Sequence, residues 1–283
     1  MPNRTQIESL TAQIESLWAC QDQLFETISR NNDWGHKHGS DWTFADVPFH
    51  LTYCNRDLII RPIQLGKDLP ADEQRSFKSP ADLGVYNGGR FTEKPATQTV
   101  EESLVELETS RNEIRRLLSE MNDADLERPA WYPFGGGMWA NVRAPLQFCL
   151  AHDWSEFTQL RIHMRLSEPI PDPAITSAYV VRMLNLSMLR RLNSQAANGV
   201  PFSAVYAFTD PGVTPVTLQV SDGAAKIIPG DYEHPDLVMT QSAETFEKTL
   251  RGIQKFPDAI QSGAIQINNF ESLTTFGQLF PMA

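Results

Sequence analysis

The chain has 283 residues, of which 41% are hydrophobic and 21% are charged, and its formal net charge is −11. This length and composition favour two globular domains over a disordered chain. The acidic balance argues against a dedicated nucleic-acid binder, because phosphates need a basic face, and against electrostatic docking on anionic lipid.

The sequence shows no segment for membrane insertion or export. No stretch approaches the roughly 18 apolar residues of a transmembrane helix. The N-terminal MPNRTQIESL lacks the apolar core of a signal peptide. The three cysteines are far apart and form no CxxC pair, which argues against a disulfide framework. We therefore expect a cytoplasmic protein, either a monomer or a homodimer, without an integral membrane segment.

Apolar residues recur at helical spacing in four segments of the first half of the chain. They predict helices within residues 1–30, from Thr43 to about Pro62, from Thr97 to Met121 and from Val142 to Arg165. Residues 63–96 are rich in proline and glycine and predict a long connection, and residues 129–137 predict a loop. Four helices with one long crossover predict an all-α four-helix bundle over residues 1–168.

The pattern changes after a proline-rich stretch, which predicts a linker over residues 169–176. Beyond it, residues 177–283 predict short helices and strands in alternation, with Ser221-Asp222-Gly223 as a hairpin turn. The expected helices are 177–196, 243–251 and 271–280, and the expected strands include 216–220, 225–228, 237–240 and 264–267. The second domain is therefore expected to be α+β with a mostly antiparallel sheet.

The predicted fourth helix carries a row of polar side chains beside its apolar stripe. On a helical wheel this row contains Cys149, His152, Glu156, Gln159 and His163. An unpaired buried glutamate is costly, and a divalent metal ion bound by groups four residues apart would offset that cost. We therefore predict that His152 and Glu156 are metal ligands. His163 lies some 10 Å beyond Glu156 and is expected to be a cation at the helix end.

His50 in the predicted second helix is the candidate third ligand. Two histidines and one carboxylate form a site with open positions for water or a substrate. Asp57 and Gln159 are candidates for outer partners that orient the ligands. The aromatic residues around the Gly135-Gly136-Gly137 loop are candidates for lining the mouth of the site, and they are Trp131, Tyr132, Phe134 and Trp139.

Interpretations without a metal stay open for each of these residues. His50 would then be a core-edge histidine hydrogen-bonded to Asp57 or Tyr53. Glu156 would lie on a solvated face or pair with an arginine such as Arg56. Asp57 and Gln159 would be plain surface residues, and the aromatic loop would be an ordinary packed turn between helices.

Two segments resemble motifs of a known family. Residues 42–51, in which Trp42 begins the helix and His50 follows eight residues later, resemble the second-helix motif of the DinB-like family. Residues 152–160, with a second ligand position at Glu156 and then Gln159, resemble its fourth-helix motif. The resemblance implies a four-helix bundle that binds one divalent metal ion through His50, His152 and Glu156.

The residue types at the expected ligand positions resemble one branch of the family more than the others. The second position of the pair is often histidine in the family, and here it is Glu156. Two histidines and one glutamate are similar to the ligand set of the branch of mycothiol-dependent maleylpyruvate isomerases, in which the glutamate precedes the histidine.

Residues 177–283 resemble a sterol-carrier-protein type 2 domain. The features are Asp222-Gly223 after a strand, Gly252 after a helix, and the segment 257–267. The resemblance implies an α+β fold with an apolar pocket, and the same order of domains occurs in the maleylpyruvate isomerase-like branch. Apolar residues of the first helix of this domain would line the pocket or form plain core, namely Met183, Leu184, Leu186, Met188 and Leu189.

These features predict an enzyme that depends on a divalent metal ion (zinc, nickel or iron) and acts on a small electrophilic substrate. A metal-bound thiolate or water would be the nucleophile, so we expect a thiol-dependent S-transferase or isomerase that uses a low-molecular-weight thiol, or a hydrolase. The alternative is a binding protein for lipid or another apolar small molecule, whose bundle is stabilised by the metal.

Overall fold

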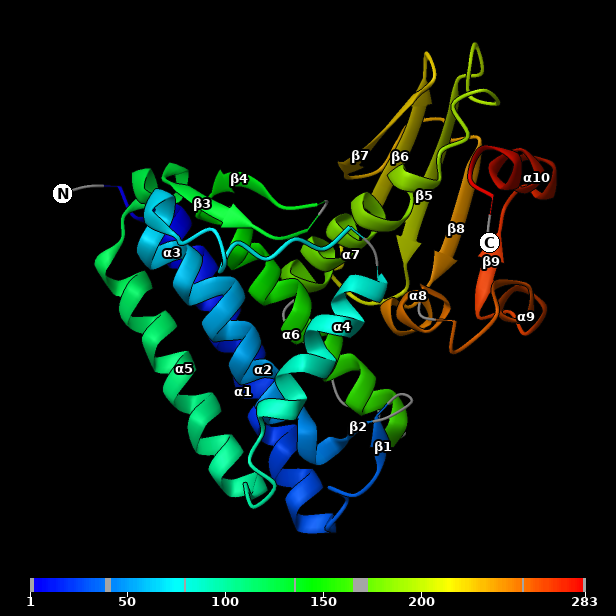
Figure 1. Ribbon diagram of the computed structural model, residues 1–283. Coiled ribbons are helices and arrows are strands. Elements are labelled where there is room, and N and C mark those ends of the chain that lie inside the picture. Colours follow the sequence, from blue (N-terminus) through cyan, green and yellow to red (C-terminus); the bar gives the residue numbers. More distant parts are fainter. Residues whose placement is uncertain are drawn as a thin grey trace. The chain divides into compact units, whose positions relative to one another are not determined.

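The computed structural model describes residues 3–38, 42–78, 80–134, 136–164, 173–250 and 252–281. The chain divides into two compact units, Met1–Met164 and Arg165–Ala283. The first unit is largely helical and the second contains a five-stranded sheet with helices, which confirms the predicted order of a helical bundle and an α+β domain (Figure 1). Among the described helices, none combines the length and apolar composition that a membrane crossing requires.

Four long helical segments form the N-terminal unit, as predicted. They are α1 (Thr5–Asn31), the continuous run of α2 (Val47–Cys54), η2 (Asn55–Ile60) and α3 (Arg61–Leu65), α5 (Val100–Glu120), and α6 (Arg143–Met164). Helix α1 packs against α6, and α2 packs against α5. The core side chains between them, such as Trp18, Leu51 and Ile114, are almost fully buried.

The second long segment is not a plain α-helix. Residues Asn55–Ile60 wind as a π-helix, whose hydrogen bonds span five residues instead of four. The helix then continues through Pro62 to Leu65, three residues beyond the predicted end. Pro62 is the second residue of α3 and directly follows the π-helical segment, where the main-chain hydrogen-bond pattern changes.

The long connection predicted over residues 63–96 is wrong. It contains η3 (Gly66–Asp68) and a full helix, α4 (Pro80–Glu93). Three glycines lower the helix propensity of this segment by about 1 kcal/mol each, which explains why its sequence reads as a loop. Tertiary packing overrides that cost, because Tyr86 and Phe91 of α4 lie against the ring of Tyr53.

The loop predicted over residues 129–137 is also wrong in part. Strands β3 (Pro129–Tyr132) and β4 (Met138–Asn141) form an antiparallel hairpin in which Trp131 faces Trp139. Another short pair, β1 (Lys37–His38) and β2 (Trp42–Thr43), precedes η1 (Phe44–Asp46), and η4 (Asp123–Glu127) follows α5. The paired tryptophans explain the error, since cross-strand aromatic contacts stabilise a hairpin that local sequence does not reveal.

The C-terminal unit has one sheet with the strand order β7-β6-β5-β8-β9. Every neighbouring pair is antiparallel except β5 and β8, which are parallel. The strands are β5 (Phe202–Phe208), β6 (Val216–Ser221), β7 (Ala224–Pro229), β8 (Leu237–Gln241) and β9 (Ile265–Ile267). The predicted turn joins β6 to β7, and both Asp222 and Gly223 have the positive φ angles of a type I′ hairpin.

Helices α7 (Pro173–Ser187), α8 (Ala243–Leu250), α9 (Phe256–Gln261) and α10 (Phe270–Leu279), with η5 (Leu189–Arg191), complete this unit. Helix α9 was not predicted, and α7 begins earlier and ends earlier than expected. Residues 169–172 of the predicted linker lie outside the described residues, and residues 173–176 belong to α7.

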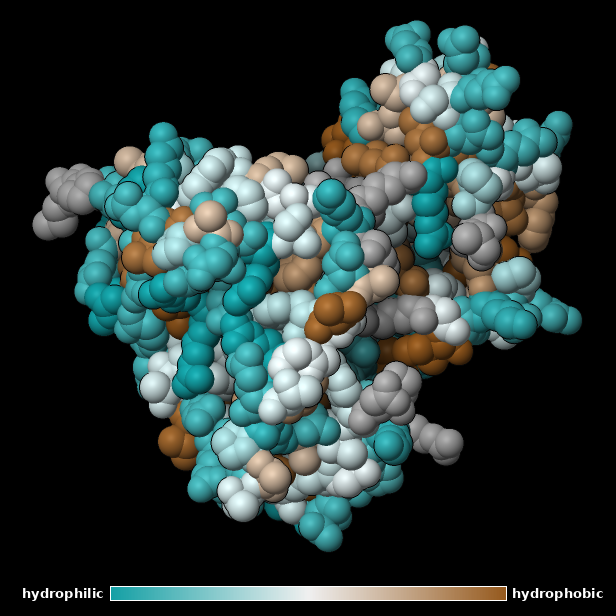
Figure 2. All heavy atoms as spheres, in the orientation of Figure 1, coloured by the Kyte–Doolittle hydropathy of each residue, from teal (hydrophilic) through white to brown (hydrophobic). Residues whose placement is uncertain are grey.

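The visible face of the N-terminal unit is mostly hydrophilic (Figure 2), in keeping with the excess of acidic residues. Helix α5 contributes several surface ion pairs to this face, for example Arg116 with Glu113 and Glu120. Such exposed pairs each contribute little to stability. The stability of the unit therefore depends on its apolar core and on the polar groups buried within it.

We expect Thr99→Ala to destabilise the N-terminal unit by about 1 kcal/mol. The Thr99 side chain accepts from the N–H of Glu102, whose carboxylate accepts from the N–H of Thr99, so the two groups satisfy the first turn of α5. All six tryptophans lie within residues 1–164. Urea unfolding followed by tryptophan fluorescence therefore reports on this unit alone.

Thr109→Ala is the matched control, because it removes the same atoms from an exposed position inside α5. An equal shift of the urea midpoint in both variants would contradict a specific role for the cap.

Candidate metal centre

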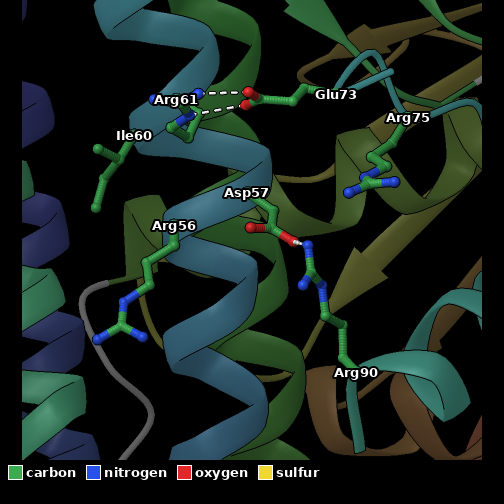
Figure 3. Close-up of a pocket in the computed structure, with 7 residues that line it drawn as sticks. All are labelled: Arg56, Asp57, Ile60, Arg61, Glu73, Arg75 and Arg90. Carbon is green, nitrogen blue, oxygen red and sulfur yellow. Dashed lines mark hydrogen bonds and ion pairs between the residues drawn. The ribbon is translucent and has the colours of Figure 1, made fainter. Parts of the chain in front are cut away.

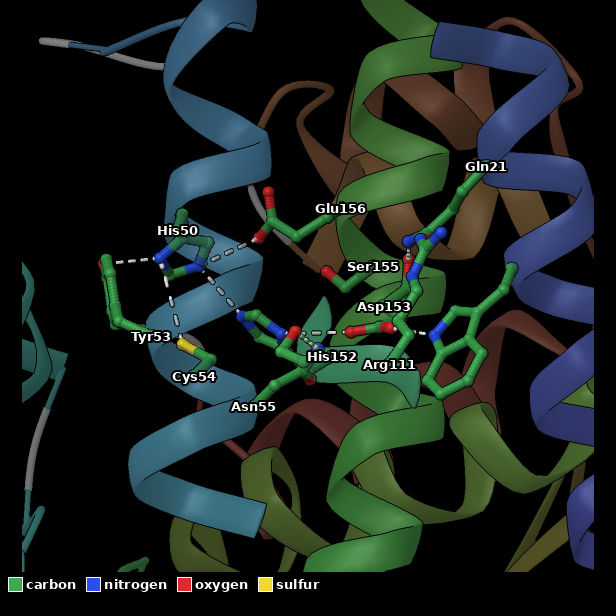
Figure 4. Close-up of polar contacts among 12 residues, drawn as sticks. Gln21, His50, Tyr53, Cys54, Asn55, Arg111, His152, Asp153, Ser155 and Glu156 are labelled. Carbon is green, nitrogen blue, oxygen red and sulfur yellow. Dashed lines mark hydrogen bonds and ion pairs between the residues drawn. The ribbon is translucent and has the colours of Figure 1, made fainter. Parts of the chain in front are cut away.

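His50, His152 and Glu156 meet between two helices (Figure 4). Helix α2 supplies His50, and α6 supplies His152 and Glu156 one turn apart. The Nε2 atoms of the two histidines are 2.9 Å apart, and Glu156 Oε1 lies 4.0 Å from His50 Nε2. His50 and Glu156 are buried, and His152 is partly buried. The structure thus brings His50 close to each of the other two predicted ligands.

The hydrogen bonds of His50 fix which ring nitrogen carries its proton. The Tyr53 hydroxyl donates to Asn87 Oδ1 at 3.1 Å, so it accepts at 2.5 Å from His50 Nδ1. A neutral His50 therefore has its proton on Nδ1 and its lone pair on Nε2, the atom that faces His152. Tyr53 is one of the two partners that the sequence offered for this histidine.

His152 has a carboxylate on the side of its Nδ1 atom. Its Nδ1 lies 3.5 Å from Asp153 Oδ1, and Asp153 Oδ2 accepts a 2.7 Å hydrogen bond from the indole N–H of Trp18. The ring of Phe148 stacks on the imidazole with a centroid distance of 5.1 Å. Asp153 Oδ1 has no hydrogen-bond partner, so the charge of this carboxylate, rather than a hydrogen bond, acts on the Nδ1 side of the imidazole.

Glu156 is ionised although it is buried. Burial raises the pKa of this carboxyl, but the hydrogen bond from His38 and the nearby His50 and His152 outweigh burial and hold the pKa well below its usual value. His38 Nε2 donates to Glu156 Oε2 at 2.8 Å, and the side chain of His38 is itself buried. Sequence reasoning missed His38, because it lies between α1 and α2, in the short strand β1, and shows no periodic pattern.

Cys54 is a second residue that the sequence did not single out. Ligand atoms of His50, Cys54 and His152 all lie within 4.8 Å of one another. The Cys54 sulfur, however, is 3.9 Å from His50 Nδ1, the nitrogen that binds Tyr53. Burial and the neighbouring carboxylates Glu156 and Asp153 raise the pKa of its thiol. A cation on the Nε2 side of His50 therefore faces the Glu156 carboxylate.

The predicted outer partners lie in different places. Gln159 is near Glu156, with its Nε2 atom 3.5 Å from Oε1. Asp57 accepts a 2.7 Å hydrogen bond from Tyr86 and pairs with Arg90 at 2.5 Å, two helical turns along from His50. Tyr53, Asp153 and His38 instead make the contacts that orient the proposed ligands.

The predicted aromatic lining is only partly near the site. Phe134 packs on Phe148 at 4.9 Å between ring centroids, and Phe148 in turn stacks on His152. Trp131 and Trp139 contact each other at 5.3 Å across the hairpin, and Trp139 is exposed.

Two further residues have partners that decide between earlier interpretations. Arg56 lies 3.9 Å from Glu106, whereas Glu156 is bound by His38, so the Arg56–Glu156 pair is not formed. His163 Nδ1 lies 2.7 Å from the backbone oxygen of Gln159 in the last turn of α6.

The lone pairs of two ring nitrogens 2.9 Å apart repel unless a cation lies between them. A proton or a metal ion satisfies this requirement, and the neighbouring ionised Glu156 adds a negative charge to the same space. Two imidazoles and a carboxylate are a donor set that suits zinc, nickel and iron. The residues present therefore fit a divalent metal ion.

The depressed pKa of Glu156 predicts a pH dependence of stability in chelator-treated protein. Because folding lowers this pKa, the ionised carboxylate stabilises the fold at pH values above 4.5, the ordinary pKa of a glutamate, and this contribution is lost as pH falls further. Glu156→Gln should cost about 2 kcal/mol at pH 7. The variant should then lose less stability than wild type between pH 5 and pH 3, measured by urea unfolding.

Glu26→Gln removes an exposed carboxylate of α1 and serves as the charge control. Parallel acid profiles of wild type and Glu156→Gln would contradict this account of the carboxylate.

Comparisons with solved structures give distant likenesses. The mycothiol-dependent maleylpyruvate isomerase is 12% identical, with 92% of both chains covered and a TM-score of 0.48. Sterol carrier protein 2 is 24% identical over 37% of this chain and 86% of its own, with a TM-score of 0.27. The sec-alkylsulfatase Pisa1 from Pseudomonas sp. is 14% identical, with a TM-score of 0.32. The chain covers only 44% of that enzyme, against 85% of its own length.

The sequence itself carries a family assignment. No curated protein matches the chain. The family description "DinB superfamily" matches residues 13–160, a range that contains His50, His152 and Glu156. This range spans more than half of the 283 residues. The chain therefore belongs to the DinB superfamily.

Proposed function

We propose that the protein is a divalent-metal-dependent enzyme whose metal ligands are His50, His152 and Glu156. The observation that carries this proposal is the convergence of the Nε2 atoms of His50 and His152, 2.9 Å apart, beside the buried carboxylate of Glu156. Membership of the DinB superfamily and the resemblance of the two ligand-bearing segments to its motifs support it.

Three protein ligands leave positions open for a reactant. A metal ion held here supplies Lewis-acid chemistry, since it lowers the pKa of a bound thiol or water. Two imidazoles and one carboxylate form a facial set of the kind found in sites that bind substrate directly. The side chains therefore suit activation of a small nucleophile rather than a closed structural site.

The surrounding residues keep the ligands oriented and dry. Tyr53 is hydrogen-bonded to the Nδ1 side of His50, and His38 to the outer oxygen of Glu156. The Asp153 carboxylate lies 3.5 Å from Nδ1 of His152. The ring of Trp42 lies 4.6 Å from that of His50 between centroids. Such outer contacts set the tautomer and the basicity of metal ligands, and apolar cover strengthens the electrostatic interactions inside.

The reaction we propose is attack of a low-molecular-weight thiol on a small electrophile, which makes the protein a thiol-dependent transferase or isomerase. The resemblance to the maleylpyruvate isomerase-like branch supports a thiol, and water as the nucleophile would make it a hydrolase instead. In the transferase case a sulfur–carbon bond forms, the leaving group departs with its electron pair, and the thiol proton passes to solvent.

Elemental analysis tests the metal directly. Protein purified without a histidine tag should contain about one divalent metal ion per chain, and His50→Ala should lose it. Wild type that stays metal-free after incubation with zinc, nickel or iron would overturn the proposal.

The same measurement identifies the third ligand. Glu156→Gln should weaken metal affinity by more than the roughly 10–100-fold typical of an outer partner. Cys54→Ala removes the rival donor and should change the affinity only slightly. The reverse ranking of the two variants would assign Cys54 in place of Glu156.

Turnover tests the chemistry. Metal-loaded wild type should accelerate the reaction of a small thiol with an activated aryl chloride, measured as chloride release. His152→Ala should fall to the uncatalysed rate, because it removes a ligand. Equal chloride release with and without thiol would support a hydrolase and count against the thiol-dependent reaction.

A further inference from the structure

A cavity of about 290 Å³ lies beside the same helix that carries His50 (Figure 3). Residues of η2, the start of α3, the segment before α4, and α4 itself line it. Four arginines and two carboxylates dominate the wall, namely Arg56, Arg61, Arg75, Arg90, Asp57 and Glu73. We call this space the arginine cavity. Its positive wall contrasts with the net charge of −11 for the whole chain.

The two carboxylates of the wall are each already paired with an arginine of the same wall. Glu73 accepts two hydrogen bonds from Arg61, at 2.8 and 2.5 Å, and Asp57 pairs with Arg90 at 2.5 Å. In the part of the chain that the structure describes, Arg75 has no carboxylate within 4.0 Å. Arg90 also pairs with Glu93 at 2.6 Å, and Arg56 lies 3.9 Å from Glu106. Arg75 is therefore the arginine of this wall whose charge no described carboxylate contacts.

Arg75 and Arg90 approach the same aromatic ring. Their guanidinium carbons lie 5.9 and 5.8 Å from the centroid of Tyr86, and Figure 3 shows both side chains extending toward the space beside Asp57. Arg90 has the carboxylate of Asp57 beside it, whereas Arg75 contacts the same ring with no carboxylate of the described residues next to it. Planar guanidinium forks match the oxygens of a carboxylate or phosphate.

The cavity adjoins the candidate metal centre. The ring of Tyr86 lies 5.7 Å from that of Tyr53 between centroids, and Tyr53 is bonded to His50. Asp57 lies seven residues after His50 on one continuous helical run, a separation of about 10 Å along its axis. An anion in the arginine cavity would thus be within a small molecule's length of the ligands.

We propose that the arginine cavity binds the carboxylate group of one of the two reactants, between Arg75 and Arg90. A volume of about 290 Å³ is at the low end for small-molecule sites and fits a small organic acid. The carboxylates Asp57 and Glu73 in the wall repel a dianion more than a monoanion, which favours a carboxylate over a phosphate. The role as a reactant site rests on the proposed function, whereas anion binding does not.

Calorimetric titration of metal-free protein at low ionic strength, with propionate and with inorganic phosphate, tests the cavity. Propionate should bind saturably, and Arg75→Gln should weaken it roughly tenfold or more, because a charge-assisted contact is lost. Arg75→Lys keeps the charge without the fork and should be intermediate. Arg116→Gln removes an equal charge from the exposed face of α5 and should bind propionate as wild type does.

Unchanged propionate affinity in Arg75→Gln, or no saturable binding in wild type, would overturn the proposal. Tighter binding of phosphate than of propionate would overturn the assignment of a carboxylate. Wild type that binds propionate but contains no metal in elemental analysis would contradict the proposed function and would still support anion binding in the cavity. Wild type that contains metal but does not bind propionate would contradict only the anion site.

Steady-state kinetics with metal-loaded protein then identifies the reactant. If the thiol carries the carboxylate, Arg75→Gln should raise KM for an acidic thiol but not for a neutral one, with kcat nearly unchanged. If the electrophile carries it, the same split should occur between acidic and neutral electrophiles. A KM that changes for neither reactant would overturn the role of the cavity in the reaction.

Discussion

The contact between the imidazoles of His50 and His152 is the constraint on which much of the N-terminal unit depends. To bring these rings together, α2 and α6 must pack closely, and the buried polar groups around them need partners within the protein. Asp153, the residue after His152, binds the indole of Trp18, and its backbone oxygen accepts from Gln21. Gln21 in turn binds a buried arginine of α5. One connected set of polar contacts thus joins all four long helical segments through an apolar core.

Charge is distributed unevenly around this core. At the histidine pair, an ionised carboxylate is enclosed by imidazoles, whereas two turns away the wall is rich in guanidinium groups and faces the aromatic rings of Tyr53 and Tyr86. The overall charge of the chain repels anions, so a local positive surface is needed to attract one. The proposed metal centre and the proposed anion site are therefore separate places on one helical run.

The family resemblance and the two-part fold could be predicted from the sequence, because long amphipathic helices and the motifs around His50 and His152 are local signals. Helix α4 could not be predicted, because its glycines disfavour a helix and the packing that stabilises it cannot be read from the sequence. The ligand-bearing helices were placed correctly, but His38 was not found because its contact with Glu156 joins positions 118 residues apart. The arginine cavity is assembled from three separate segments and leaves no pattern in any one of them. An apolar ligand in the C-terminal unit stays a prediction.

The π-helical segment Asn55–Ile60 stands between the two sites and contains Asp57 of the cavity wall. A π-turn accommodates one residue more than an α-turn, so it absorbs a single inserted residue while the helix on either side keeps its packing. A relative one residue shorter at this point would retain His50 and its neighbours but present a different charged wall. The charged wall can thus diverge through chain length at one turn, without any substitution at His50, His152 or Glu156.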